Sequence, residues 1–264
     1  MPLRGWRRWW RREPAFGTAE WAALLAGNPL LAGLDPAARE RLRELTARFL
    51  ERQTITPVQG LELDASERLA LAAHASLPLL RFGAQGLRGW SQVIVHPGAF
   101  RVEHGRHGAS LEMDALDVVH EGFDEREGES WEHGPMVLSW ADLAAEMAEP
   151  EPGYQLVVHE MAHKLDALDG LMDGTPPLPR DWQRQWAIDF GAAFAAIQAA
   201  LDTDPEAETA IDAYAAESPE EFFAVTSEYH FTAPELLRAA FPAVAAHLER
   251  FYGPPPVLAV ETGD

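Results

Sequence analysis

A five-residue segment in the second half of the chain combines two histidines with a glutamate. His159-Glu160-Met161-Ala162-His163 fits the pattern H-E-x-x-H. In a helix, residues four apart lie on the same face, so both imidazoles can reach one zinc ion. The glutamate lies at the flank of that face, where it can take a proton from metal-bound water. The segment therefore predicts a hydrolytic zinc site, with His159 and His163 as ligands and Glu160 as the general base.

Two other interpretations use the same residues. The histidines can be ordinary surface or core side chains beside an unrelated glutamate. The string Glu160-x-x-His163 also matches half of a carboxylate-bridged di-iron site in a helical bundle. Such a site needs a second Glu-x-x-His, and the sequence contains none. The zinc interpretation is therefore favoured.

A catalytic zinc site needs a third protein ligand, and the fourth position is left to water. The chain has no Cys, so this ligand must be a His, Asp or Glu. Glu221 is the leading candidate, because it opens a predicted helix in which Phe222 and Val225 look buried. The same glutamate also forms a capping box with Ser218, in which it would only fold back on the helix start. Three nearby acids remain as alternative ligands: Glu217, Glu220 and Glu228.

One further acid and several histidines lie near the motif or earlier in the chain. Asp166, three residues after His163, is a candidate for orienting an imidazole without binding the metal itself. A solvated carboxylate at the helix end is an equally good interpretation. The remaining histidines of the middle region stand at no ligand spacing and are interpreted as surface or core residues: His96, His104, His107, His120 and His133.

Composition narrows the classes of protein that can carry this site. The 264 residues are 47% hydrophobic and 24% charged, which is typical of a folded globular protein. Forty-two Asp and Glu against 21 Lys and Arg give a net charge of -21, which disfavours nucleic acid as the main ligand and favours a basic partner. The absence of Cys excludes disulfides, thiolate zinc sites and iron–sulfur clusters.

The elements that must position the site separate along the chain. Short apolar runs at residues 92–95 and 136–138, and a weaker one at 117–119, predict strands, and residues 121–132 have the composition of a loop. A helix is predicted from Asp35, a plausible N-cap followed by Pro36. Further helices are predicted over residues 66–77, 154–168, 182–201, 218–229 and 243–251. Strands before residue 141 and helices after it indicate an α+β fold.

The chain is expected to form one domain with a short extension. Residues 1–13 are basic and rich in tryptophan, and are predicted to form an N-terminal tip. Residues 14–264 are predicted to form a single domain with two lobes, at about 14–152 and 153–264. We find no secretory signal and no apolar run long enough to cross a membrane, so a cytoplasmic location is expected.

The motifs closely resemble the Mlc titration factor A family. The resemblance rests on residues 159–170, HEMAHKLDALDG, and 221–229, EFFAVTSEY, with supporting matches at 95–97, 137–140 and 233–236. It covers roughly residues 20–252. Members are zinc metallopeptidases of the gluzincin type, with a catalytic core similar to that of anthrax lethal factor. The family is named for binding Mlc, the repressor of glucose phosphotransferase genes.

The resemblance implies both a fold and a set of roles. The implied fold is a zincin-like metallopeptidase with a small mixed sheet before the active-site helix and a mostly helical C-terminal half. His159 and His163 are implied as ligands with Glu221 as the third. Glu160 is implied as the general base. Tyr214, seven residues before Glu221, matches a tyrosine that stabilises the transition state, although a half-buried loop tyrosine is the alternative interpretation.

The expected function is hydrolysis of peptide bonds with one zinc ion per chain. The run at residues 136–138 is a candidate edge strand that aligns a peptide substrate by backbone pairing. The alternative is a binding protein that sequesters an Mlc-type transcription repressor, with zinc structural or incidental. Both functions can reside in one molecule.

Overall fold

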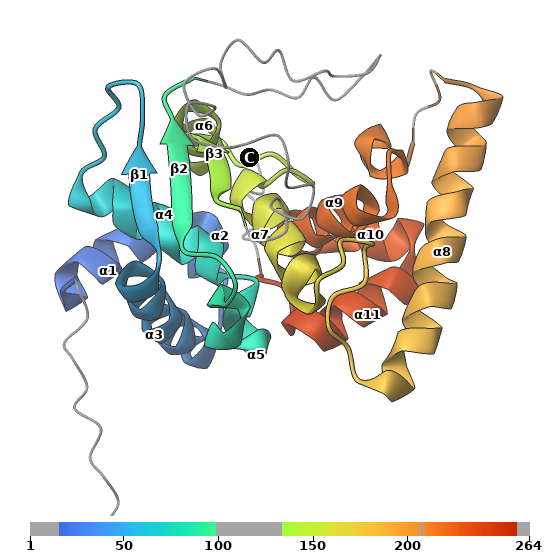
Figure 1. The fold of residues 1–264 in the computed structure, drawn as a ribbon, viewed down its shortest axis with the longest axis horizontal. Helices are drawn as coiled ribbons and strands as arrows, with labels where there is room; N and C mark the ends of the chain where they lie inside the picture. Colours follow the sequence, from blue (N-terminus) through green and yellow to red (C-terminus); the bar gives the residue numbers. More distant parts are fainter. Residues whose placement is uncertain (1–15, 99–133, 206, 208, 258–264) are drawn as a thin grey trace, which may run out of the picture.

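The computed structural model describes residues 16–98, 134–205, 207 and 209–257. It combines many helices with a small sheet, so the predicted α+β class is confirmed. Figure 1 shows the sheet and the N-terminal helices on one side and the C-terminal helices on the other, with α7 (Leu156–Asp166) between them. The predicted N-terminal tip, the predicted strand at 117–119 and the predicted loop at 121–132 lie outside the described residues.

Short helices build the N-terminal side. The longest begins as predicted: the Asp35 carboxylate accepts hydrogen bonds from the amides of Ala37 and Ala38 at 2.8 and 2.9 Å, and Pro36 occupies the first helical position. These helices are α1 (Thr18–Ala26), α2 (Pro29–Ala32), α3 (Pro36–Arg52), α4 (Ala65–Ser76) and α5 (Leu79–Phe82), followed by the 3-10 turn η1 (Ala84–Leu87).

Three parallel strands form the sheet in the order β1-β2-β3. The strands are β1 (Thr54–Pro57), β2 (Gln92–His96) and β3 (Met136–Ser139). The register pairs Ile55 with Val93 and Val95 with Leu138. The chain between β1 and β2 contains α4 and α5, which gives the long crossover that a parallel pair requires. The edge strand β3 packs against α7.

Two of the described strands were predicted and one was missed. The predictions at 92–95 and 136–138 are confirmed by β2 and β3, whereas β1 was not predicted. A mixed sheet was expected, and the strands that the structure describes all run parallel. Parallel strands are covered on both faces, which agrees with the nearly complete burial of β2.

The C-terminal side is a layer of helices around an aromatic core. Trp186 and Phe190 stack with ring centroids 3.9 Å apart, and Phe223 and Phe251 pack against Trp186. The elements after β3 are α6 (Trp140–Ala148), α7, the 3-10 turn η4 (Ala167–Asp169), α8 (Arg180–Thr203), the 3-10 turn η5 (Ala213–Ala216), α9 (Pro219–Thr232), α10 (Pro234–Ala240) and α11 (Pro242–Tyr252). This core fixes α9, which faces α7.

No helix in the described part of the chain has both the length and the apolar character that a membrane span requires.

Phe223 provides a test of this packing. Its side chain is fully buried between α8, α9 and α11. Phe223→Ala should lower the free energy of unfolding by about 3–5 kcal/mol, because it removes buried apolar surface and leaves a cavity. Urea denaturation measures this change. Ile188→Ala on the exposed side of α8 is the control and should change the unfolding free energy by less than about 0.5 kcal/mol. Equal effects of the two changes would contradict the described core.

Candidate metal centre

The H-E-x-x-H segment lies on α7, as the spacing predicted. Gln155 caps this helix, and its side-chain oxygen accepts a hydrogen bond from the Val158 amide at 2.7 Å. A stripe of apolar residues is buried on one side of the helix, made of Val157, Val158, Met161, Ala162 and Leu165. Burial of this apolar face fixes the rotation of the helix about its axis. His159 and His163 lie on an adjoining face and remain partly exposed.

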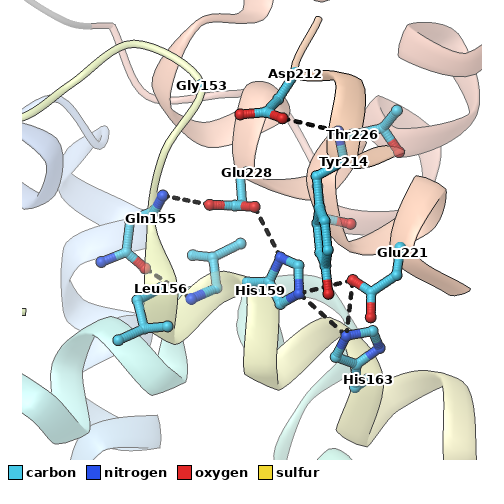
Figure 2. Close-up of polar contacts among 12 residues, drawn as sticks. Gly153, Gln155, Leu156, His159, His163, Asp212, Tyr214, Glu221, Thr226 and Glu228 are labelled. Carbon is cyan, nitrogen blue, oxygen red and sulfur yellow. Dashed lines mark hydrogen bonds and ion pairs between the residues drawn. The ribbon is translucent and has the colours of Figure 1, made fainter. Parts of the chain in front are cut away.

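The two histidines and Glu221 bring three ligand atoms together. The Nε2 atoms of His159 and His163 lie 3.1 Å apart. The Oε2 atom of Glu221 lies 3.0 Å from Nε2 of His159 and 3.5 Å from Nε2 of His163. Figure 2 shows the carboxylate pointing between the two rings. Among the described residues this is the set of His, Asp and Glu whose ligand atoms could hold a metal ion.

Glu221 comes from the first turn of α9. Ser218 caps this helix, and its hydroxyl accepts a hydrogen bond from the Glu221 amide at 3.3 Å. The reciprocal half of a capping box is not formed here, because the Glu221 side chain points to the histidines. The neighbouring Phe222 and Phe223 are buried, so the backbone of this turn is held against the core.

The three residues fit a zinc ion by geometry and by chemistry. Ligands arranged tetrahedrally about zinc at about 2.0–2.2 Å lie roughly 3.3–3.6 Å apart, close to the separations described above. Two imidazole nitrogens and a carboxylate oxygen are a ligand set that zinc accepts. In addition, Oε2 of Glu221 is buried and, among the described residues, has no hydrogen bond of normal geometry. A buried oxygen of this kind is satisfied by a bound cation.

A second carboxylate orients the first histidine. The Oε1 atom of Glu228 lies 2.8 Å from Nδ1 of His159, and its Oε2 accepts a hydrogen bond from the Gln155 amide at 2.6 Å. Glu228 is only 1% exposed. The sequence offers Glu228 as an alternative ligand, and its place behind the ring is not among the sequence-based predictions. The spacing of the two glutamates could have indicated this place. Glu221 and Glu228 are seven residues apart, about two turns, so they lie on the same face of one helix.

These contacts set the charges of the site. Burial alone would lower the pKa of His159, but Glu228 and Glu221 outweigh it and hold that pKa well above its ordinary value. Burial opposes ionisation of Glu221, yet the two imidazoles hold the pKa of this carboxyl well below its usual range. The site therefore favours a carboxylate beside positive charge, the arrangement that a bound cation also stabilises.

Tyr214 lies over the same site, in the turn η5. Its ring centroid is 6.1 Å from that of His159, and its hydroxyl forms a hydrogen bond with Glu221. Asp212 fixes this turn, because its carboxylate accepts a hydrogen bond from the Tyr214 amide at 2.8 Å. Burial, together with the negative charge of Glu221, raises the pKa of Tyr214. The hydroxyl therefore keeps its proton at neutral pH and is able to donate it in a hydrogen bond.

Asp166 is fully buried at the end of α7. Its Oδ2 accepts a hydrogen bond from the Gly174 amide at 2.7 Å, and burial raises its pKa to about 7. Gly174 has a φ of +78° and passes against the Pro219 carbonyl, so a side chain there would be strained and would clash. Asp166 Oδ1 and His163 Nδ1 are both buried without a hydrogen bond to the described atoms. The orienting role of Asp166 stays a prediction.

The other candidates are placed as follows. Glu160 is partly exposed on α7, next to His159. His96 is buried at the end of β2, and no grouping with other ligands that could hold a metal includes it among the described residues. The predictions for the other four histidines, His104, His107, His120 and His133, concern residues outside the described ranges.

Fold and site together define a chain built like a metallopeptidase, with a helix carrying two histidines and a glutamate from a second helix. The model of the glucose-regulated metallo-peptidase M90 family matches residues 3–253, and the chain belongs to this family. It is 37% identical over 255 residues to Mlc titration factor A of Serratia proteamaculans, covering 96% of this chain and 94% of the relative. It is 38% identical to the proteins of that name from Klebsiella pneumoniae strain 342 and Yersinia pestis, covering 94% and 90% of this chain and 91% and 86% of the relatives.

Removal of Glu221 should weaken metal binding. Glu221→Ala deletes one of three converging ligand atoms, so most of the bound metal should be lost on dialysis against a mild chelator. Elemental analysis of the dialysed protein gives the metal content. Glu220→Ala is the matched control in the same turn and should keep its metal. The reverse result would show that Glu220 and not Glu221 faces the histidines.

Glu228→Gln should lower metal affinity by about 10–100-fold while leaving all three ligands in place, because the ring of His159 loses its charged partner. Competition with a chromophoric chelator measures the affinity. Glu40→Gln on the exposed side of α3 removes the same charge far from the site and controls for net charge. An unchanged affinity in Glu228→Gln would contradict the orienting role.

Proposed function

We propose that this protein is a zinc-dependent peptidase with one zinc ion per chain. The observation that carries the proposal is the meeting of His159, His163 and Glu221 within 3.0–3.5 Å at the H-E-x-x-H helix. Membership in a metallopeptidase family supports it. Zinc bound there would supply a Lewis acid and lower the pKa of a water molecule. The proposal includes a cytoplasmic location and one domain of two lobes over residues 14–264.

Proton transfer is assigned to Glu160. It follows His159 directly on α7, so its carboxylate lies at the flank of the ligand face. From this position it takes a proton from the attacking water and returns it to the leaving amine. Because α7 is anchored in the core, the Glu160 carboxylate stays in a fixed position relative to His159 and His163.

Tyr214 is assigned to the carbonyl oxygen of the substrate. Its hydroxyl contacts Glu221 and therefore lies at the edge of the ligand set. When the carbonyl carbon becomes tetrahedral, negative charge develops on its oxygen, and a protonated phenol stabilises that charge by a hydrogen bond. The raised pKa of Tyr214 keeps this proton in place.

The edge strand β3 is assigned the role of binding the substrate backbone. β3 packs against α7, and the described residues give it one strand neighbour, β2. An extended peptide can pair with such an edge. Lys164, next to His163, donates a hydrogen bond to the Gly134 carbonyl at 2.9 Å and so ties the approach to β3 to the active-site helix.

A second candidate function is binding of an Mlc-type transcription repressor. The name of the relatives supports it, and so does the net charge of -21, which suits a basic DNA-binding partner. Hydrolysis and repressor binding are compatible in one molecule. Direct binding of nucleic acid is not part of the proposal.

Glu160→Gln separates the two functions. Peptide hydrolysis should fall by about 10²–10⁴-fold, because the change removes the general base and keeps the shape of the side chain. Metal content and capture of a purified Mlc-type repressor should stay as in the wild type. A fluorogenic peptide assay, elemental analysis and a pull-down measure the three properties. Wild-type hydrolysis by a metal-loaded Glu160→Gln protein would contradict the role of Glu160 as general base, and absence of hydrolysis by the metal-loaded wild type would contradict the peptidase assignment.

Tyr214→Phe tests the assigned oxyanion donor. The change removes one hydroxyl whose interaction is made mainly in the transition state, so kcat should fall by about 10²–10³-fold with little change in KM. Metal content and melting temperature should stay close to wild type, because the ring remains. Steady-state kinetics on a peptide substrate gives both constants. Near wild-type turnover in the metal-loaded variant would exclude this role.

A further inference from the structure

A second group of carboxylates lines a pocket away from the metal centre. The pocket, about 190 Å³ in volume, lies between α6 and the segment that leads into α7. Four acids line it: Asp142, Glu146, Glu149 and Glu151. Its volume is below the roughly 300–1,000 Å³ of pockets that hold drug-sized ligands, so it suits a single side chain or a small ion.

Two of these acids are buried and incompletely paired. Asp142 is 9% exposed and Glu146 is 8% exposed. Among the described residues, Oδ2 of Asp142 and Oε1 of Glu146 have no hydrogen-bond partner. The other oxygen of Glu146 accepts hydrogen bonds from the Leu156 amide and the Gln155 side chain, both at 3.1 Å. Each side chain thus has one buried oxygen without a partner among the described residues, and both residues line the pocket.

The pocket gathers four carboxyl groups. None of the described residues that line it is basic. Burial, with added repulsion from Glu228, Asp142 and Glu151, raises the pKa of Glu146 to about 8. Unpaired buried acceptors are costly, and a cation that donates hydrogen bonds removes that cost.

We infer that this pocket binds a guanidinium group, carried by an arginine side chain of another protein or by a small guanidine. A planar guanidinium presents five N–H donors and reaches several carboxylates at once. Ala145, Ala148 and the ring of Tyr154 provide apolar surface for its stem and its weakly hydrated face. This inference is independent of the proposed peptidase function.

The spacing of the acids favours a guanidinium over a metal ion. In the metal centre, three ligand atoms lie within 4.8 Å of one another, and no such group occurs in the pocket among the described residues. A single ion needs its ligand oxygens close together, whereas the donors of a guanidinium are spread over several ångströms.

Isothermal titration of the full-length protein with N-acetyl-arginine amide tests the inference, at physiological salt. N-acetyl-citrulline amide has nearly the same shape without the charge and is the ligand control. The arginine probe should bind and the citrulline probe should not. Asp142→Asn should weaken binding of the arginine probe by about 10-fold or more, because a charged acceptor is lost. Asp202→Asn, on the exposed end of α8, makes the same change of charge elsewhere and should bind as the wild type does.

Two further measurements keep the result unambiguous. Glu149→Gln alters only the exposed rim, so it tests the pocket without risk to folding and should weaken binding about 2–5-fold. Agmatine compared with an arginine-containing peptide distinguishes a small guanidine from a protein side chain. Equal binding of the citrulline probe, unchanged binding in a folded Asp142→Asn protein, or binding of calcium but not of the arginine probe would each overturn the inference.

Discussion

The site depends on one carboxylate that joins two helices distant in sequence. Glu228 of α9 contacts the ring of His159 at 2.8 Å and accepts a hydrogen bond from the Gln155 amide, at the start of α7, at 2.6 Å. An ionised carboxylate can only accept, so His159 donates through Nδ1, and its Nε2 is turned toward Glu221 and His163. The same interaction therefore sets the position of the helix and the orientation of the ring.

The rest of the fold keeps this carboxylate in place. Glu228 is buried on a helix whose other side carries Phe222 and Phe223, and these pack against the aromatic rings of α8. Stacked and edge-to-face rings of this kind resist rotation of the helix about its axis. A small rotation of α9 would move Glu221 and Glu228 together, because they lie about two turns apart on one face. The aromatic core is thus needed to place the candidate metal ligands as well as to stabilise the fold.

Local spacing predicted one half of the site, and tertiary packing decided the other half. His159, Glu160 and His163 could be chosen from the sequence because i, i+4 geometry is a property of the helix itself. Whether Glu217, Glu220, Glu221 or Glu228 meets the histidines depends on how α9 is rotated against α7, which no local pattern specifies. Tyr214 could be chosen only by resemblance, since a 3-10 turn has no periodicity that marks its functional face. The strand β1 was missed because Thr54 to Pro57 is short, ends in proline and gains its hydrogen bonds from β2, far along the chain.

Gln155 connects the two polar regions of the molecule. Its backbone N–H donates to Glu228, and its side-chain oxygen caps α7. Its side-chain nitrogen lies 3.1 Å from Glu146 Oε2 and 3.0 Å from His74 Nδ1. The wall of the acidic pocket and the carboxylate behind His159 thus share one residue as a neighbour. The negative charge of Glu228 is also one cause of the raised pKa of Glu146, so the two regions interact electrostatically.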